Sequence, residues 1–261
     1  MGTRKEAGNL TPAELGALQG AFTRAYAIRD ERGYGFFAGV HGLPLPSYCA
    51  HNTPLFLPWH RAYLYFFERA LADLDPDANL AWWDWTTPRS HREGLPAAFR
   101  RTAARVNRNP LATGPVRLSA AELSRFRADP ANRGALSDGP EPWTLRDPGD
   151  PDELPRAATI ARALAAPTFA DLSTLLEGIH SSVHVWVGGA MSLISVAAYD
   201  PAFYSHHAMI DRVWYLWQNS GRGLPPPTAL LDRALPPFPM TVRETLDIAR
   251  LGYGYALDVA G

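Results

Sequence analysis

The chain has 261 residues, 46% of them hydrophobic and 11% aromatic, so it is long enough for a single domain, 1–261, around a sizeable core. Its 25 Lys plus Arg balance 26 Asp plus Glu, and the resulting net charge of −1 argues against a nucleic-acid partner. A single cysteine, Cys49, excludes an internal disulfide framework.

The first predicted element is a helix near the N-terminus. In Thr11–Glu14 an N-cap threonine precedes a proline and an early acid, and the helix is expected to continue to about Asp30. Gly33 and Gly35 then break the chain before a short apolar run that leads to His41.

The second predicted helix covers 58–71, where apolar and aromatic side chains recur at helical spacing until the Asp75–Pro76 pair ends it. From 86 to 155 the composition shifts to Pro, Gly, Arg and Asp. This shift predicts surface connections, with short helices at 97–106 and 120–127.

Helical patterning returns in the last third of the chain. We expect helices at 159–164 and 169–176, then a helical segment carrying two further histidines, and a last core helix over 200–218. The proline-rich stretch 221–240 is expected to close over the outside.

The histidines are the candidate metal ligands. The chain has eight: His41, His51, His60, His91, His180, His184, His206 and His207. Two of them, His180 and His184, stand four residues apart, which puts both rings on one helix face with Cβ atoms about 6 Å apart. This spacing often arises by chance and is weak evidence on its own.

The arrangement of the set is more informative than any pair. Six histidines fall into two regions, His41, His51 and His60 in one and His180, His184 and His207 in the other. Three neutral nitrogen donors in each region, without thiolate or carboxylate, suit copper, and zinc is the main competitor. A zinc protease is disfavoured because Ser181, not glutamate, follows His180, and a di-iron bundle would need Glu-x-x-His pairs that the sequence lacks.

Longer motifs surround these histidines. The run from His51 to Arg61, HNTPLFLPWHR, resembles the first copper motif of the tyrosinases, catechol oxidases and hemocyanins. These proteins and the o-aminophenol oxidases form one family of binuclear type-3 copper proteins. The run from His180 to Gly189, HSSVHVWVGG, followed by DPAFYSHH at 200–207 and DRVW at 211–214, resembles the second copper motif.

Two further motifs extend the resemblance over nearly the whole chain. Trp83–Thr86 matches the W-D-W signature of the family, and Leu251–Tyr255 resembles the tyrosine motif that closes its catalytic domain. The resemblance implies a mainly α fold, in which a four-helix bundle core holds a di-copper site, two helices from each half bear ligands, and long loops wrap the core.

The resemblance also assigns the ligands. It gives His41, His51 and His60 to one copper and His180, His184 and His207 to the other, although His41 is placed mainly by position and by completeness of the set. His206 is then structural, because the family uses the second histidine of such a pair. His91 matches no motif and is interpreted as a surface histidine, while Asp211 either orients a ligand imidazole or forms a salt bridge.

The implied activity is a copper-dependent oxidation. Members of the family use two copper ions and O2 as co-substrate to oxidise o-diphenols or o-aminophenols to o-quinones or quinone imines, and some also hydroxylate monophenols. A glutamate and an asparagine near the first ligand of the second copper are associated with holding water for the latter reaction. Here Glu177 precedes His180 by three residues, as a water holder or as a solvated helix-end acid.

Ser181 takes the place of the family's asparagine, directly after His180. We therefore expect o-diphenols or o-aminophenols to be oxidised faster than monophenols; the alternative is a full tyrosinase with strong monophenol hydroxylase activity. Cys49 stands two residues before His51, as in relatives where the cysteine sulfur is joined to that histidine, and the alternative is a small buried thiol.

Two other classes of function remain open: a hemocyanin-like O2 carrier, and a copper-binding assembly or chaperone module. The chain ends shortly after Tyr255, so we expect no shielding domain, which favours the enzyme. The start lacks a signal peptide and no stretch reaches the roughly 18 apolar residues of a membrane span, so we expect a cytoplasmic protein unless a partner exports it. The expected partners are a small phenolic substrate and, as an option, a copper-delivery protein.

Overall fold

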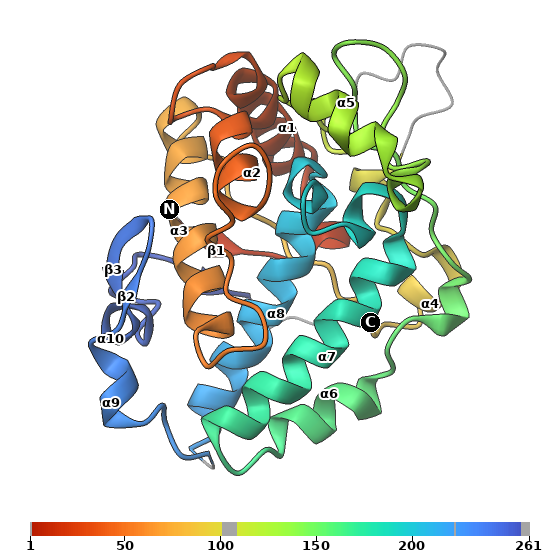
Figure 1. Ribbon diagram of the computed structural model, residues 1–261. Coiled ribbons are helices and arrows are strands. Elements are labelled where there is room, and N and C mark those ends of the chain that lie inside the picture. Colours follow the sequence, from red (N-terminus) through yellow and green to blue (C-terminus); the bar gives the residue numbers. More distant parts are fainter. Residues whose placement is uncertain (1, 101–108, 222, 257–261) are drawn as a thin grey trace.

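A computed structural model describes residues 2–100, 109–221 and 223–256, and within these ranges the chain is mainly helical (Figure 1). The α-helices are α1 Pro12–Ala27, α2 Tyr34–His41, α3 Phe56–Leu74, α4 Ser90–Glu93, α5 Ala120–Ala128, α6 Ala157–Leu164, α7 Phe169–Val187, α8 Ala202–Asn219, α9 Thr228–Leu231 and α10 Val242–Thr245. Short 3₁₀ turns lie at Ala7–Asn9, Ala97–Phe99, Pro130–Asn132, Pro151–Glu153, Gly189–Ser192 and Ala197–Tyr199.

The sheet content consists of two small ladders. The strands are β1 Thr3–Arg4, β2 Ala234–Leu235, β3 Phe238–Thr241 and β4 Gly254–Tyr255. Strands β1 and β4 pair in parallel, which joins the two ends of the described chain, and β2 and β3 pair antiparallel. None of the described helices is long and apolar enough to span a bilayer.

Three long helices, α3, α7 and α8, form the centre of the molecule (Figure 1). Helix α1 packs on α3, α6 packs on both α7 and α8, and α2 lies against the 3₁₀ turn that precedes α8. The four helices α2, α3, α7 and α8, two from each half of the chain, carry six of the eight histidines, while His51 lies on a loop and His91 on α4. The predicted fold class, mainly α with a histidine-bearing helical core and long loops, is therefore confirmed.

The predicted elements agree best where the signal is local. Thr11 caps α1 and forms a reciprocal capping box with Glu14, as the sequence predicts, and the helix ends at Ala27, three residues before the expected end. The predicted helices 58–71 and 200–218 are α3 and α8. The predicted helix at 120–127 is α5, whose N-cap Ser119 forms a second capping box.

Three segments differ from the prediction. The apolar run before His41, expected only as a short connection, is helix α2, which begins after Gly33. The stretch 169–176 and the following segment form one continuous helix, α7. At 97–106 the structure has a 3₁₀ turn over Ala97–Phe99, and 101–108 lie outside the described residues.

The proline-rich segment 221–240 does cover the outside of the helical core, as predicted. Its strands β2 and β3 contact α3, on the left of Figure 1. The indole Nε1 of Trp59 donates a hydrogen bond of 2.8 Å to the carbonyl of Pro236, which fixes these two strands to the helix that carries His60. Strands β2 and β3 therefore close one side of the histidine-bearing core.

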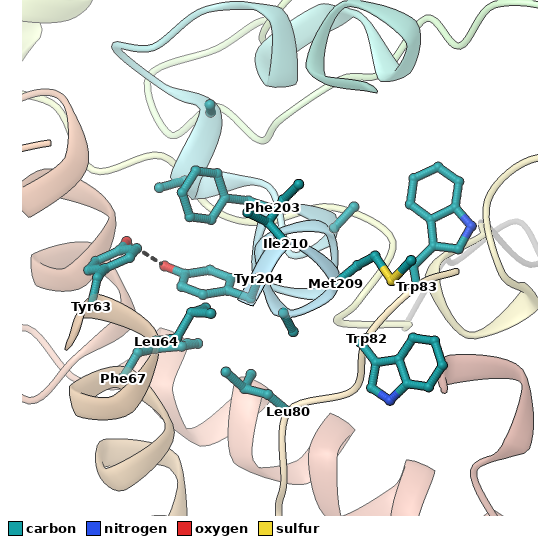
Figure 2. Packing of buried hydrophobic residues seen from close by; sticks show 14 of the residues in the cluster. Tyr63, Leu64, Phe67, Leu80, Trp82, Trp83, Phe203, Tyr204, Met209 and Ile210 are labelled. Carbon is teal, nitrogen blue, oxygen red and sulfur yellow. Dashed lines mark hydrogen bonds between the residues drawn. The ribbon is translucent and has the colours of Figure 1, made fainter. Parts of the chain in front are cut away.

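Aromatic side chains fill the space between α3 and α8. Figure 2 shows Tyr63 and Tyr204 pointing toward each other, with their hydroxyl oxygens 3.1 Å apart. The Phe67 ring stacks on Tyr204 with ring centroids 4.0 Å apart. Because the Tyr63 hydroxyl also donates to the Phe37 carbonyl at 2.8 Å, both buried polar groups are satisfied inside an apolar layer.

A buried charge network joins α3, α8 and both chain ends. Arg4 of β1 pairs with Glu68 of α3 at 2.7 Å and with Asp211 of α8 at 3.1 Å. Arg61 of α3 pairs with the same Asp211 carboxylate, and the hydroxyl of Tyr253 donates to it at 2.8 Å. All these side chains are buried, so each charge depends on its partners for compensation.

Candidate metal centre

Three histidines of the first half of the chain meet between α2 and α3. His41 ends α2, His60 lies in the first turns of α3, and His51 lies on the loop between these helices. One ring nitrogen from each lies within 4.8 Å of the others. These three histidines are called cluster A.

Backbone carbonyls orient two rings of cluster A. The Nδ1 of His60 lies 2.8 Å from the Phe56 carbonyl, one turn earlier in α3, and the Nδ1 of His41 lies 3.3 Å from the carbonyl of Ile194. The chain can come this close to α2 because a glycine, Gly42, follows His41: a Cβ there would lie 2.4 Å from the Ser195 carbonyl. With Nδ1 donating, Nε2 of each ring is left as a lone-pair donor.

The second cluster, cluster B, lies between α7 and α8. His180 and His184 occupy one face of α7, and the Nε2 atoms of both lie close to Nε2 of His207 on α8, at 3.1 and 3.2 Å. The Nδ1 of His184 lies 2.7 Å from the carbonyl of Met191, which fixes the ring in the same way as in cluster A. The predicted i, i+4 pair therefore does present both rings to one point.

The two clusters face each other across the core. The rings of His60 and His207 stack with centroids 4.5 Å apart and planes 16° apart. The rings of His51 and His180 lie with centroids 5.5 Å apart. The six histidines predicted as ligands thus form one continuous group.

Burial keeps these imidazoles neutral. Desolvation lowers the pKa of His41, His60, His180 and His207 well below 6.5, and neighbouring histidines lower it further. Desolvation lowers the pKa of His184 to about 4. A cluster of neutral imidazoles has no internal charge to compensate, and its nitrogen lone pairs are free to bind a cation.

The residues fit two metal ions with nitrogen ligands. Among the described residues, the buried Nε2 atoms of His41, His51 and His60 have no hydrogen-bond partner. Burying polar atoms in this way costs free energy unless a ligand binds to them. In cluster B the three Nε2 atoms converge within hydrogen-bond distance, and the buried Nδ1 atoms of His180 and His207 have no partner among the described residues. Imidazole sets of this kind suit copper or zinc, and no thiolate or carboxylate belongs to either cluster.

His206 also lies in this region and is a further candidate metal ligand beside His207. Its ring is buried, packs against His180 with centroids 5.2 Å apart, and belongs to the same group of close ring nitrogens as cluster B. Neither of its nitrogens has a partner among the described residues. The contacts at 3.1 and 3.2 Å are made by Nε2 of His207, so His207 remains the proposed ligand and His206 the proposed structural neighbour.

His51 differs from the other five because no helix holds it. A carboxylate takes the place of the backbone carbonyl that orients His41, His60 and His184. Its Nδ1 lies 3.4 Å from Oε1 of Glu177 on α7, and the same oxygen accepts a hydrogen bond of 2.6 Å from the Asn52 backbone N–H. Asn52 has a positive φ of 55°, so the carboxylate stabilises a turn that a non-glycine residue adopts with some strain. No local pattern in the sequence indicates this contact, which joins two segments 125 residues apart.

The second predicted catalytic residue, Ser181, turns away from the Glu177 carboxylate. Its hydroxyl donates a hydrogen bond of 2.9 Å to the backbone carbonyl of Glu177, one turn earlier in α7. Both predicted residues thus lie beside the clusters, but their side chains are engaged with other groups. Cys49 is half-buried, with Sγ 3.0 Å from the Ser47 hydroxyl oxygen.

Two other interpretations from the sequence can be decided. Of the alternatives for Asp211, the structure shows the salt bridge, with Arg61 and Arg4. The prediction that His91 is a surface residue is wrong: the side chain is buried and Nε2 lies 3.3 Å from the carbonyl of Pro155. The composition of 86–155 predicted exposure, whereas α4 packs under the 3₁₀ turn Pro151–Glu153.

A cavity of about 190 Å³ opens onto both clusters. His41 and His51 of cluster A and His180 and His184 of cluster B line it. Its apolar rim includes Val185 and Ile194, which are 70% and 56% exposed. The two histidine clusters are therefore accessible to a small molecule from outside.

The chain matches the family model of the common central domain of tyrosinase over residues 31–220. It belongs to the tyrosinase family of binuclear copper proteins. It is 36% identical to a tyrosinase of Streptomyces lincolnensis over 191 residues, which cover 66% of this chain and 65% of the relative. It is 30% identical to hemocyanin units G and H of Sepia officinalis over 237 residues, or 85% of this chain and 39% of the relative.

Solved structures agree with the family assignment. The chain superposes on a functional unit of octopus hemocyanin with a TM-score of 0.80 at 27% identity, covering 98% of this chain and 68% of that one. The chain spans 39% of the length of the Sepia hemocyanin and 65% of the length of the Streptomyces tyrosinase. Both oxidases and hemocyanins are among its relatives, so the activity has to be argued from the site.

Proposed function

We propose that this member of the tyrosinase family oxidises o-diphenols or o-aminophenols to o-quinones or quinone imines while O2 is reduced to water. Two substrate molecules each give up two electrons and two protons, which balances one O2 reduced to two waters. Copper, when bound by His41, His51 and His60 and by His180, His184 and His207, supplies the redox chemistry that couples the two half-reactions.

The observation that carries the proposal is the cavity at the clusters. A volume of about 190 Å³ accommodates one aromatic ring, since an engineered apolar cavity of about 150 Å³ binds benzene. The Met191 and Ile194 side of this cavity would face the ring, and the backbone carbonyls of these two residues also fix His184 and His41. Substrate binding and ligand orientation therefore depend on the same loop.

The positions of Glu177 and Ser181 support diphenol over monophenol oxidation. Monophenol hydroxylation needs a base or a positioned water at the phenol. Here Oε1 of Glu177 is engaged with Asn52 and His51, and the Ser181 hydroxyl bonds to a backbone carbonyl. With Oε1 of Glu177 and the Ser181 hydroxyl proton already used, the pair does not offer the two free groups with which the family's glutamate and asparagine hold a water.

The decisive experiment is a substrate panel on copper-loaded protein, containing a monophenol, 4-tert-butylcatechol and o-aminophenol. The proposal expects rapid turnover of the last two in air and slow turnover of the monophenol. Ser181→Asn should raise the monophenol rate relative to the catechol rate. A wild-type monophenol rate equal to the catechol rate would instead support a full tyrosinase.

Reversible O2 carriage is the second candidate, because hemocyanin units are similar to nearly the whole chain. An O2 carrier needs its metal centre shielded from phenols, whereas the cavity here is rimmed by exposed Val185 and Ile194. Copper-loaded protein that takes up O2 reversibly and leaves 4-tert-butylcatechol unchanged would establish the carrier.

A further inference from the structure

A second cavity adjoins the metal cavity. It is a groove of about 470 Å³ between one face of α7 and the loop after His51, lined on the helix by Ser173, Thr174, Glu177 and Ser181. Ser181 lines both cavities, so the groove meets the metal cavity at this residue. A substituent that leaves the metal cavity past Ser181 therefore reaches the groove along α7.

The two cavities have room for different parts of one substrate molecule. The metal cavity, at about 190 Å³, has room for one aromatic ring and little more. Any longer substituent on the ring must leave this cavity, and the groove offers more than twice the volume directly beside it. The geometry therefore favours a ring with an extended tail over a compact phenol.

The groove has one ionisable group, Glu177, among the described residues that line it. Oε1 of this carboxylate is engaged with Asn52 and His51, whereas the described residues make no hydrogen bond to Oε2. The other polar groups of the lining are hydroxyls and an amide, and neither cavity is lined by a described Lys or Arg. A cationic tail would thus find a charged partner here, whereas an anionic tail would meet the negative charge of Glu177 and no cation among the described lining residues.

We propose that this groove is a subsite for the tail of an extended phenolic substrate, and that it selects cationic, hydrogen-bond-donating tails over carboxylates. The inference rests on the proposed function, since it places the oxidised ring over the clusters. It assigns Glu177 two contacts: Oε1 holds the loop of His51, and Oε2 receives the tail.

The kinetic test uses three catechols on the copper-loaded protein: 3-(3,4-dihydroxyphenyl)propylamine, the propanoate of equal length, and 4-methylcatechol without a tail. We expect kcat/KM for the amine to exceed that for the propanoate by at least ~10-fold, which corresponds to ~1.4 kcal/mol. Glu177→Gln should bring the two values together. Amine and propanoate values within about twofold in the wild type would overturn the proposal.

Filling the groove provides a second test with a matched control. A Cβ at Gly178 meets nothing within 4 Å, so Gly178→Phe places a ring in the groove without a backbone clash, and a helix-interior glycine is replaced by a better helix former. This variant should lower the ratio of amine to 4-methylcatechol kcat/KM by about tenfold. Gly16→Phe, on α1 and with equally open surroundings, should leave that ratio unchanged.

Binding without turnover separates this proposal from the proposed function. Calorimetry with 3-phenylpropylamine and 3-phenylpropanoate, which carry no oxidisable hydroxyl, should show the amine binding at least ~10-fold more tightly, with the difference lost in Gly178→Phe. Inactivity toward all catechols would overturn the oxidase and leave this binding result to decide the groove. Catechol turnover with equal binding of both ligands would overturn the groove alone.

Discussion

Asp211 offers the sharpest test of how the fold supports the metal centre. The residue is 4% exposed, its carboxylate forms ion pairs with Arg61 and Arg4, and the hydroxyl of Tyr253 donates to it at 2.8 Å. Asp211→Asn keeps the shape but removes the charge, so two buried guanidinium groups lose their shared partner. Breaking a buried pair in this way costs about 3–5 kcal/mol.

The assay is thermal unfolding of the metal-free protein, followed by circular dichroism. For a chain of this size, 1 kcal/mol shifts Tm by about 2–4 °C, so a loss of roughly 10 °C is expected. Asp232→Asn is the control, because Asp232 forms an ion pair with Arg243 at 2.9 Å on the surface, where the expected cost is below about 1 kcal/mol. If Asp211→Asn does not accumulate, Tyr253→Phe, which removes one hydrogen bond to the same carboxylate, should cost about 1–2 kcal/mol.

The stability that the Asp211 carboxylate contributes should depend on pH in a definite direction. Burial alone would raise the pKa of Asp211, but the charges of Arg61 and Arg4 outweigh it and lower the pKa below 3.8. A depressed carboxyl pKa contributes stability that is fully present above the unfolded value and is lost as the pH falls through the folded value. The difference between wild type and Asp211→Asn should therefore be constant near neutrality and shrink below about pH 4. Equal melting temperatures of Asp211→Asn and Asp232→Asn at neutral pH would refute the network's role.

Three further predictions concern the metal site itself. Glu177→Ala should lower copper affinity at cluster A by about 10–100-fold, since the carboxylate holds the loop of His51, and metal analysis after dialysis against a chelator should then find nearer one copper than two per chain. His207→Ala should also lose one copper, whereas His206→Ala should retain both; the reverse order would exchange their roles. If Cys49 is joined to His51, copper loading in air lowers the intact mass by two hydrogens, and Cys49→Ala shows no such loss.

Local signals explain what could be predicted from sequence. The capping residues of α1, the apolar periodicity of α3 and the i, i+4 histidines of α7 each act within a few residues, so their outcome is visible in the sequence. The six proposed ligands come together as the motif resemblance implied.

Contacts between distant segments explain what could not be predicted. Helix α2 is short, contains two glycines and lacks a side-chain cap, so its helical form depends on packing against the turn before α8. The burial of His91 depends on the turn at Pro151–Glu153, and the Glu177–His51 contact joins α7 to a loop of the other half. No local pattern carries such information, because each contact is made only once the two halves have packed.

The buried network and two of the proposed ligands, His60 and His207, lie on the same two helices, α3 and α8. This shared position explains why charged groups are buried there. Arg61 directly follows His60 on α3, and Asp211 lies one turn after His207 on α8, so their ion pair fixes the two helices beside the two stacked ligand rings. An apolar contact there could stabilise the fold as well, but it would leave the helices freer to slide and rotate. A site that must hold facing imidazoles in register gains more from a directional contact than from one that only excludes water.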